Sequence, residues 1–154
     1  MKTITSSFVL ATALVAITSG IASARTVGVS TGHNVYSVAN EDNCMRNEYA
    51  NGGIKNNCST AQLWGVDLVV DPGGSKTMQV SGYVNSSTYC IGRGLDMYGN
   101  VYGQTNWTYF PSGSPSYRNL QLTGTAYVPS GGMLQLQCWI APGQTLSVVN
   151  NLNG

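Results

Sequence analysis

The acidic side chains are the groups in this chain best suited to acid–base catalysis. A pair of Asp or Glu residues on opposite sides of a glycosidic bond can hydrolyse it. The six acidic residues are Glu41, Asp42, Glu48, Asp67, Asp71 and Asp96. Asp71 and Asp96 fall in turn-like segments, where an aspartate is expected to accept backbone hydrogen bonds, and Asp67 falls on the outward face of its strand. A small carbohydrate-active enzyme is therefore kept as an alternative, and a non-catalytic protein is the leading expectation.

The sequence contains few of the residues that another kind of catalytic site or a metal site would need. His33 is the only histidine and lies in a turn-like setting, so no base is at hand for a serine or cysteine nucleophile. No two cysteines have the close spacing of a structural zinc site. Asp96 and Asn100 could offer oxygen ligands to calcium, but their spacing is typical of a turn and does not match an EF-hand loop. We expect no cofactor and no metal site.

The aromatic side chains are the strongest candidates for ligand binding. Some fall on strand faces opposite the apolar residues, and others gather between residues 98 and 110. The candidate ligand-binding residues are Tyr83, Tyr102, Trp107, Tyr127 and Trp139. Exposed rings can stack on the C–H faces of sugars while Asn and Gln bind the hydroxyl groups. Alternatively, the same rings pack across strands on a sheet face. Trp64 falls on an apolar face and is expected in the core.

Two runs of alternating polarity between residues 117 and 141 predict half-buried strands. One face of the first run carries Leu120, Leu122, Gly124, Ala126 and Val128, and one face of the second carries Leu134, Leu136, Cys138 and Ile140. Residues 129–132 are rich in Gly and Pro, so we expect the two strands to form a hairpin. Tyr127 and Trp139 would then lie on its outer face.

The remaining segments extend the same pattern. Strands are expected at 62–70 and 77–84, joined as a second hairpin by a Pro–Gly turn, and then at 89–95, at 101–110 and around Leu146 and Val148. The sum is about eight short strands with regular turns and no convincing helix. The sequence therefore predicts an all-β, single-domain antiparallel β-sandwich or jelly roll stapled by disulfides.

The four cysteines, Cys44, Cys58, Cys90 and Cys138, follow a secretion-type N-terminus, which indicates disulfides. Three pairings are possible. We favour Cys44–Cys58, which closes a short loop, and Cys90–Cys138, which ties a central strand to the expected hairpin.

The N-terminus has the composition of a secretory signal. Lys2 precedes an apolar run too short to span a bilayer, and Ala22, Ser23 and Ala24 form a small-residue cleavage pattern. We expect a signal peptide at 1–24 and one domain at 25–154, secreted to the periplasm or the extracellular space without membrane insertion. Once Lys2 is removed, six of the seven basic residues face six acidic ones, which argues against a nucleic-acid partner.

Two short motifs give the chain a family likeness. Gly53-Ile54-Lys55-Asn56 precedes a valine-rich strand, and a late strand contains Leu136, Cys138 and Ile140 before Pro142. In these features the chain resembles a diffuse group of small secreted bacterial proteins whose strands carry cysteines. It differs from the group in having no cysteine between residues 64 and 68. The resemblance implies a β-sandwich and no activity.

Three functions are compatible with these observations. The leading hypothesis is a secreted non-catalytic β-sandwich that recognises carbohydrate or another surface protein. The second is a structural or assembly protein of the cell surface that pairs through exposed strand edges. The third is a small carbohydrate-active enzyme with a carboxylate pair. The ligand and the oligomeric state are left open by the sequence.

Overall fold

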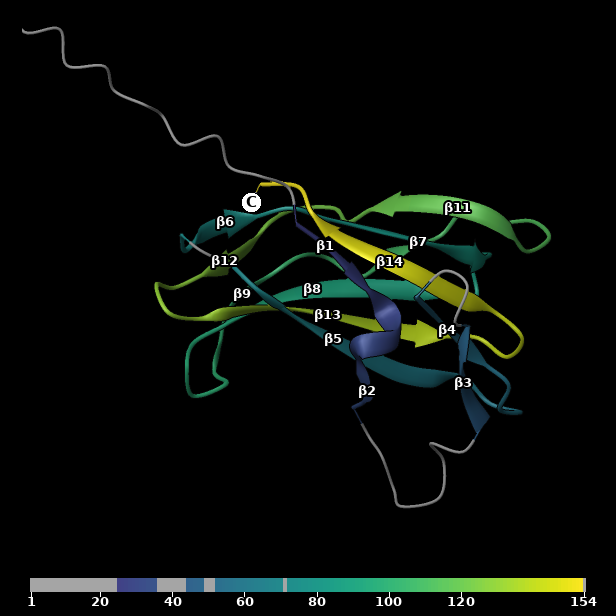
Figure 1. Cartoon of the computed structure of the whole chain (residues 1–154). Coiled ribbons are helices and arrows are strands. Elements are labelled where there is room, and N and C mark those ends of the chain that lie inside the picture. The colour runs from purple at the N-terminus through teal and green to yellow at the C-terminus, as the bar shows by residue number, and fades with distance from the viewer. Residues whose placement is uncertain (1–24, 36–43, 49–51, 71, 154) are drawn as a thin grey trace, which may run out of the picture.

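Two antiparallel β-sheets packed face to face form the body of the protein (Figure 1). The computed structural model describes residues 25–35, 44–48, 52–70 and 72–153, so the expected signal peptide at 1–24 lies outside the described residues. Within these ranges there are fourteen strands and one 3-10 turn, Val29–Thr31, and no helix long enough to cross a membrane. The expected all-β antiparallel sandwich is confirmed. The expected strand number is too low because several runs are split.

Sheet A is centred on β7 and β14. Its strand order is β11–β7–β14–β4–β3, and β1 pairs with β14 beside β4. The strands are β11 (Ser116–Gln121), β7 (Met78–Val84), β14 (Thr145–Asn151), β4 (Gly53–Asn56), β3 (Met45–Glu48) and β1 (Arg25–Gly28). The strands that come before or after those of sheet A in the sequence lie mostly in the other sheet. Most connections therefore cross from one sheet to the other.

Sheet B is centred on β8 and β13. Its order is β10–β8–β13–β5–β2, and β9 pairs with β8 beside β10. The strands are β10 (Thr108–Tyr109), β8 (Tyr89–Leu95), β13 (Met133–Ile140), β5 (Gln62–Val69), β2 (His33–Asn34) and β9 (Val101–Gln104). A two-stranded sheet C, formed by β12 (Ala126–Val128) and β6 (Gly74–Lys76), closes one end of the sandwich.

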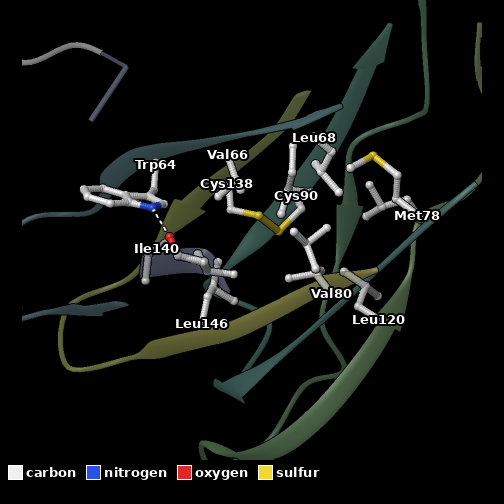
Figure 2. Packing of buried hydrophobic residues seen from close by; sticks show 14 of the residues in the cluster. Trp64, Val66, Leu68, Met78, Val80, Cys90, Leu120, Cys138, Ile140 and Leu146 are labelled. Atoms are coloured by element: carbon white, nitrogen blue, oxygen red, sulfur yellow. Dashed lines mark hydrogen bonds between the residues drawn. A yellow bond between two sulfur atoms is a disulfide. The ribbon is translucent and has the colours of Figure 1, made fainter. Parts of the chain in front are cut away.

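The core lies between sheets A and B. Alternation along β5, β7 and β13 places apolar side chains on the facing surfaces, where burial of apolar area is the main stabilising term. Trp64 lies in this core as expected, and its indole N–H donates a 2.8 Å hydrogen bond to the carbonyl of Val29 (Figure 2). The bond joins the 3-10 turn, whose Val29 is itself buried, to sheet B.

Both expected disulfides are present. Cys90 and Cys138 lie directly opposite each other on β8 and β13, and their bond is buried in the middle of the core (Figure 2). Cys44 and Cys58 close the base of the β3–β4 hairpin, where the backbone N–H of Asn57 also donates to the carbonyl of Cys44.

The two predicted hairpins are wrong, although the predicted strand faces are largely right. The run at 117–128 is broken near Gly124, which has a φ of 92°. It becomes β11 in sheet A and β12 in sheet C, while β13 pairs with β5 and β8. Likewise β5 and β7 lie in opposite sheets. A period of two specifies which face of a strand is buried, but it does not specify the partner strand.

Two glycines allow sheet C to approach sheet B. Gly94 on β8 and Gly103 on β9 are register partners, and both face Tyr127 of β12. A Cβ atom on Gly94 would overlap the carbonyl oxygen of Tyr127, and one on Gly103 would lie 2.6 Å from its backbone nitrogen. The absence of side chains therefore creates the space in which β12 packs.

Removing the central disulfide should destabilise the domain strongly. Cys90→Ala with Cys138→Ala is expected to lower the free energy of unfolding by about 4 kcal/mol, because the bond closes a loop with a sequence separation of 48. The Cys44–Cys58 bond closes a separation of only 14, so the matched double variant, Cys44→Ala with Cys58→Ala, should cost about 3 kcal/mol. Urea unfolding of both variants measures the difference, and wild-type stability without Cys90–Cys138 would contradict this role.

Gly94→Ala should loosen the attachment of β12. The added methyl group meets backbone atoms of Tyr127, which cannot move aside as a flexible side chain can, so a loss of about 1–3 kcal/mol is expected. Ser75→Ala, on the exposed side of the neighbouring strand β6, is the control and should have little effect. Thermal unfolding compares the two, and equal stabilities would show that the close approach is not needed.

Candidate functional site

The outer face of sheet B combines aromatic and polar side chains that point away from the core. On β13, Leu136 and Cys138 face inward, so Gln135, Gln137 and Trp139 face outward by alternation. On β8 the inward residue is Cys90, which places Tyr89, Ile91 and Arg93 on the outer face. Because β8 and β13 are neighbours, these two sets of side chains form one surface.

Four aromatic rings gather at one end of this surface. In register, Trp139 lies opposite Tyr89, and Tyr89 lies opposite Tyr109 of β10. The rings of Tyr89 and Tyr109 are stacked with centroids 4.7 Å apart, and Trp107 meets Tyr89 edge-on at 5.3 Å. We call Tyr89, Trp107, Tyr109 and Trp139 the aromatic cluster.

The aromatic cluster adjoins a small apolar patch outside the main core. Ile91 and Leu63 both face outward in their strands, yet they are only 2% and 4% exposed. The outer side of the sheet is therefore covered at these two positions. Tyr89 and Trp139 are themselves half-buried, whereas Trp107 and Tyr109 remain 38% and 57% exposed. The cluster thus has an inner part that packs on the sheet and an outer part that faces water.

A line of polar side chains crosses the middle of the same face. The Nε2 group of Gln137 donates to Oε1 of Gln135 at 2.5 Å, and Nε2 of Gln135 donates to Oδ1 of Asp67 at 2.7 Å. We call these three residues the amide ladder. Each hydrogen bond fixes one end of an amide. Gln137 is itself buried, at 6% exposure, so the ladder presents the Gln135 amide and the Asp67 carboxylate to water.

Arg93 lies beside Gln135, the middle residue of the amide ladder. It lies opposite Gln135 on one side and opposite Gln104 of β9 on the other. Its Nε atom is buried and has no hydrogen-bond partner in the described part of the chain. A buried donor without an acceptor is costly, and this atom is closed to a ligand, but Arg93 as a whole is only partly buried and forms no ion pair with another described residue. Part of this charged side chain therefore still faces water.

The structure brings together some of the five candidate aromatics and separates the others. Trp107 and Trp139 belong to the aromatic cluster, and Tyr102 lies on the edge strand β9 of the same sheet, on the face shared with Gln104. Tyr83 is exposed on the outer face of sheet A, opposite Tyr117. Tyr127 lies on β12, which packs on the core side of β8 and β9. The five residues therefore do not form one site.

Several residues of this face were not among the sequence candidates. They are Tyr89, Tyr109, Arg93, Gln135 and Gln137. Asp67 was considered only as a catalytic carboxylate and not as a ligand-binding residue. Alternation alone places Tyr89 and Arg93 outward once Cys90 points inward. The missing information was that β8 pairs with β13. A Cys90–Cys138 bond between directly opposed residues of these strands aligns Tyr89 with Trp139. The disulfide was the signal that could have located the cluster.

The described carboxylates do not pair on a common face. Glu48 lies on β3, with Oε1 3.9 Å from the Lys55 ammonium, and Asp67 binds Gln135 on sheet B. Asp96 accepts hydrogen bonds from the backbone N–H groups of Tyr98 and Asn100 and from the Asn100 amide, as expected for a turn. Glu41, Asp42 and Asp71 lie outside the described residues.

Metal-binding groups do not gather among the residues that the structure describes. No group of three or more His, Cys, Asp or Glu side chains is close enough there to hold an ion. His33 is exposed on β2, where its ring lies beside Gly65 at the margin of the sheet B face.

Comparisons with known proteins give no family for this chain. No protein-family model matches the sequence, and no curated protein is significantly similar to it. Among solved structures, TmCBM61 in complex with β-1,4-galactotriose has 10% identity and a TM-score of 0.46 over 87% of this chain and 90% of its own. Family 16 carbohydrate binding module-2 has 18% identity and a TM-score of 0.33 over 62% of this chain and 71% of its own.

A third solved structure is the enzymatically active domain of bacteriophage CBA120 tailspike protein 4. It has 15% identity and a TM-score of 0.47, and the match covers 64% of this chain but only 15% of that one. All three TM-scores are low, so these likenesses assign neither a family nor a ligand to the chain.

The turn held by Asp96 should respond to acid. The hydrogen bond from the Asn100 side chain, with further bonds from backbone N–H groups, lowers the pKa of Asp96 below its ordinary 3.8. The bonds are therefore complete above pH 3.8 and are lost as the pH falls through the lowered pKa. The amide NMR signals of Tyr98 and Asn100 should titrate below pH 3.8, and titration at or above that value would contradict the assignment.

Proposed function

We propose that this protein is a secreted, non-catalytic β-sandwich that recognises carbohydrate through the outer face of sheet B. The observation that carries the proposal is the exposure of Trp107 and Tyr109 beside the amide ladder on one sheet face. Its two disulfides suit an oxidising compartment outside the cytoplasm.

The chemistry of this face suits a sugar chain. The flat side of an aromatic ring offers apolar surface to the C–H groups of a pyranose. Amide and carboxylate groups offer the donors and acceptors that hydroxyl groups need, and the hydrogen bonds of the amide ladder hold them in place before binding. A single face therefore supplies both kinds of contact.

Packing alone accounts for only part of the aromatic cluster. Tyr89 and Trp139 are half-buried on a face where Ile91 and Leu63 are covered, as expected for rings that pack across strands. Trp107 and Tyr109 lie further out and keep more than a third of their surface in water. Their exposed area is available to a ligand.

Assembly through strand edges has weaker support. β2 and β10 contain two residues each, which is too short to template a partner strand. The longer edge strand β11 carries Arg118 on the same side as the buried Leu120, and an inward-pointing charge on an edge strand opposes pairing with another chain.

Truncating the exposed rings should weaken recognition without unfolding the protein. The oxidised 25–154 protein is screened on an array of neutral and acidic polysaccharides, and the best ligand is then titrated by calorimetry. Trp107→Ala and Tyr109→Ala should each weaken binding at least tenfold, about 1.4 kcal/mol. Tyr83→Ala, which removes an equally exposed ring from sheet A, should bind like the native protein.

Two outcomes would reject the proposal. One is the absence of binding to any polysaccharide on the array by correctly folded protein. The other is a loss of affinity in Tyr83→Ala with none in Trp107→Ala, which would move the binding site to sheet A.

A further inference from the structure

Arg93 is the one charged side chain on the sheet B face that lacks a protein partner in the described residues. Asp67, the nearest acid by register, lies two strands away across β13, a separation of about 10 Å between backbones. Its Oδ1 atom accepts from Gln135. The acid on this face is therefore engaged elsewhere and does not neutralise the guanidinium.

The hydrogen bonds of the amide ladder also leave Arg93 without a partner among the described residues. Gln135 lies between Asp67 and Arg93, but its Nε2 group donates toward Asp67, and its Oε1 atom accepts from Gln137. Both polar groups of the Gln135 side chain therefore bond to residues other than Arg93. The Nε group of Arg93 is left buried without an acceptor.

We infer that Arg93 forms an anionic subsite, and that the preferred ligand is an oligosaccharide carrying a carboxylate, that is, a uronate-containing chain. This rests on the proposed function. A guanidinium presents parallel N–H donors that match the two oxygens of a carboxylate, and such charge-assisted pairs are stronger than neutral hydrogen bonds.

The length of the site makes the ligand an oligosaccharide. Tyr89 and Arg93 are four residues apart on β8, which corresponds to about 13 Å along the strand. One sugar ring cannot cover both positions. A chain with one ring against Trp107 or Tyr109, its hydroxyl groups over the amide ladder and a carboxylate at Arg93 would use the whole face.

The test compares acidic chains with the same chains after their charge is removed. The probes are oligogalacturonate, alginate oligosaccharides and oligoglucuronate, each as the free acid and as the methyl ester. Native protein should bind at least one free acid tenfold or more tightly than its ester. Arg93→Gln should lose this difference, while Arg93→Lys should keep only part of it because lysine lacks the planar fork.

Arg46→Gln is the matched control, because it removes an exposed positive charge from sheet A. It should retain the preference for the free acid. Thermal unfolding checks that each variant is folded, and raising the salt concentration should reduce the preference of the native protein.

The outcomes separate this inference from the proposed function. Equal affinity for acid and ester, or binding of neutral or sulfated chains alone, would overturn the anionic subsite and leave carbohydrate recognition standing. Retention of the acid preference in Arg93→Gln would also overturn the role of Arg93. Absence of binding to every chain, charged or neutral, would overturn the proposed function itself.

Discussion

The disulfide between Cys90 and Cys138 is the constraint on which the rest of sheet B depends. It joins directly opposed residues of β8 and β13 in the centre of the core. In a β-sheet a shift of one residue turns every side chain to the other face. By fixing this register, the bond places Tyr89 beside Trp139 and Arg93 beside Gln135 on the outer face. The buried side of two strands thereby determines what the exposed side can bind.

The two faces of sheet B are stabilised by different means. The inner face packs against sheet A through apolar side chains, with the Trp64–Val29 hydrogen bond at one end. The outer face has only a thin apolar layer of Ile91 and Leu63, and the amide ladder adds polar order to it. This division leaves Trp107 and Tyr109 exposed on the outer face and Arg93 partly exposed on the same face.

The sequence was sufficient to predict the strand faces and the covalent framework. Alternation placed Leu134, Leu136 and Cys138 inward, and the cysteine spacing led to both disulfides. It was insufficient for strand pairing, because local alternation contains no information on which distant strand lies alongside. The turn near Gly124 and the crossing between β5 and β7 depend on packing between sheets. For that reason Tyr83 and Tyr127 were grouped with Trp139, from which the fold separates them.

The three tryptophans permit a direct measurement of the central claim, that carbohydrate binds the outer face of sheet B. Trp64 lies in the core, whereas Trp107 and Trp139 lie on that face. Their three indole N–H signals can be followed by NMR while an oligosaccharide that binds the protein is titrated into its oxidised form. The account predicts that the Trp107 and Trp139 signals shift together with ligand concentration while the Trp64 signal stays in place. Unchanged Trp107 and Trp139 signals at saturating ligand would contradict it.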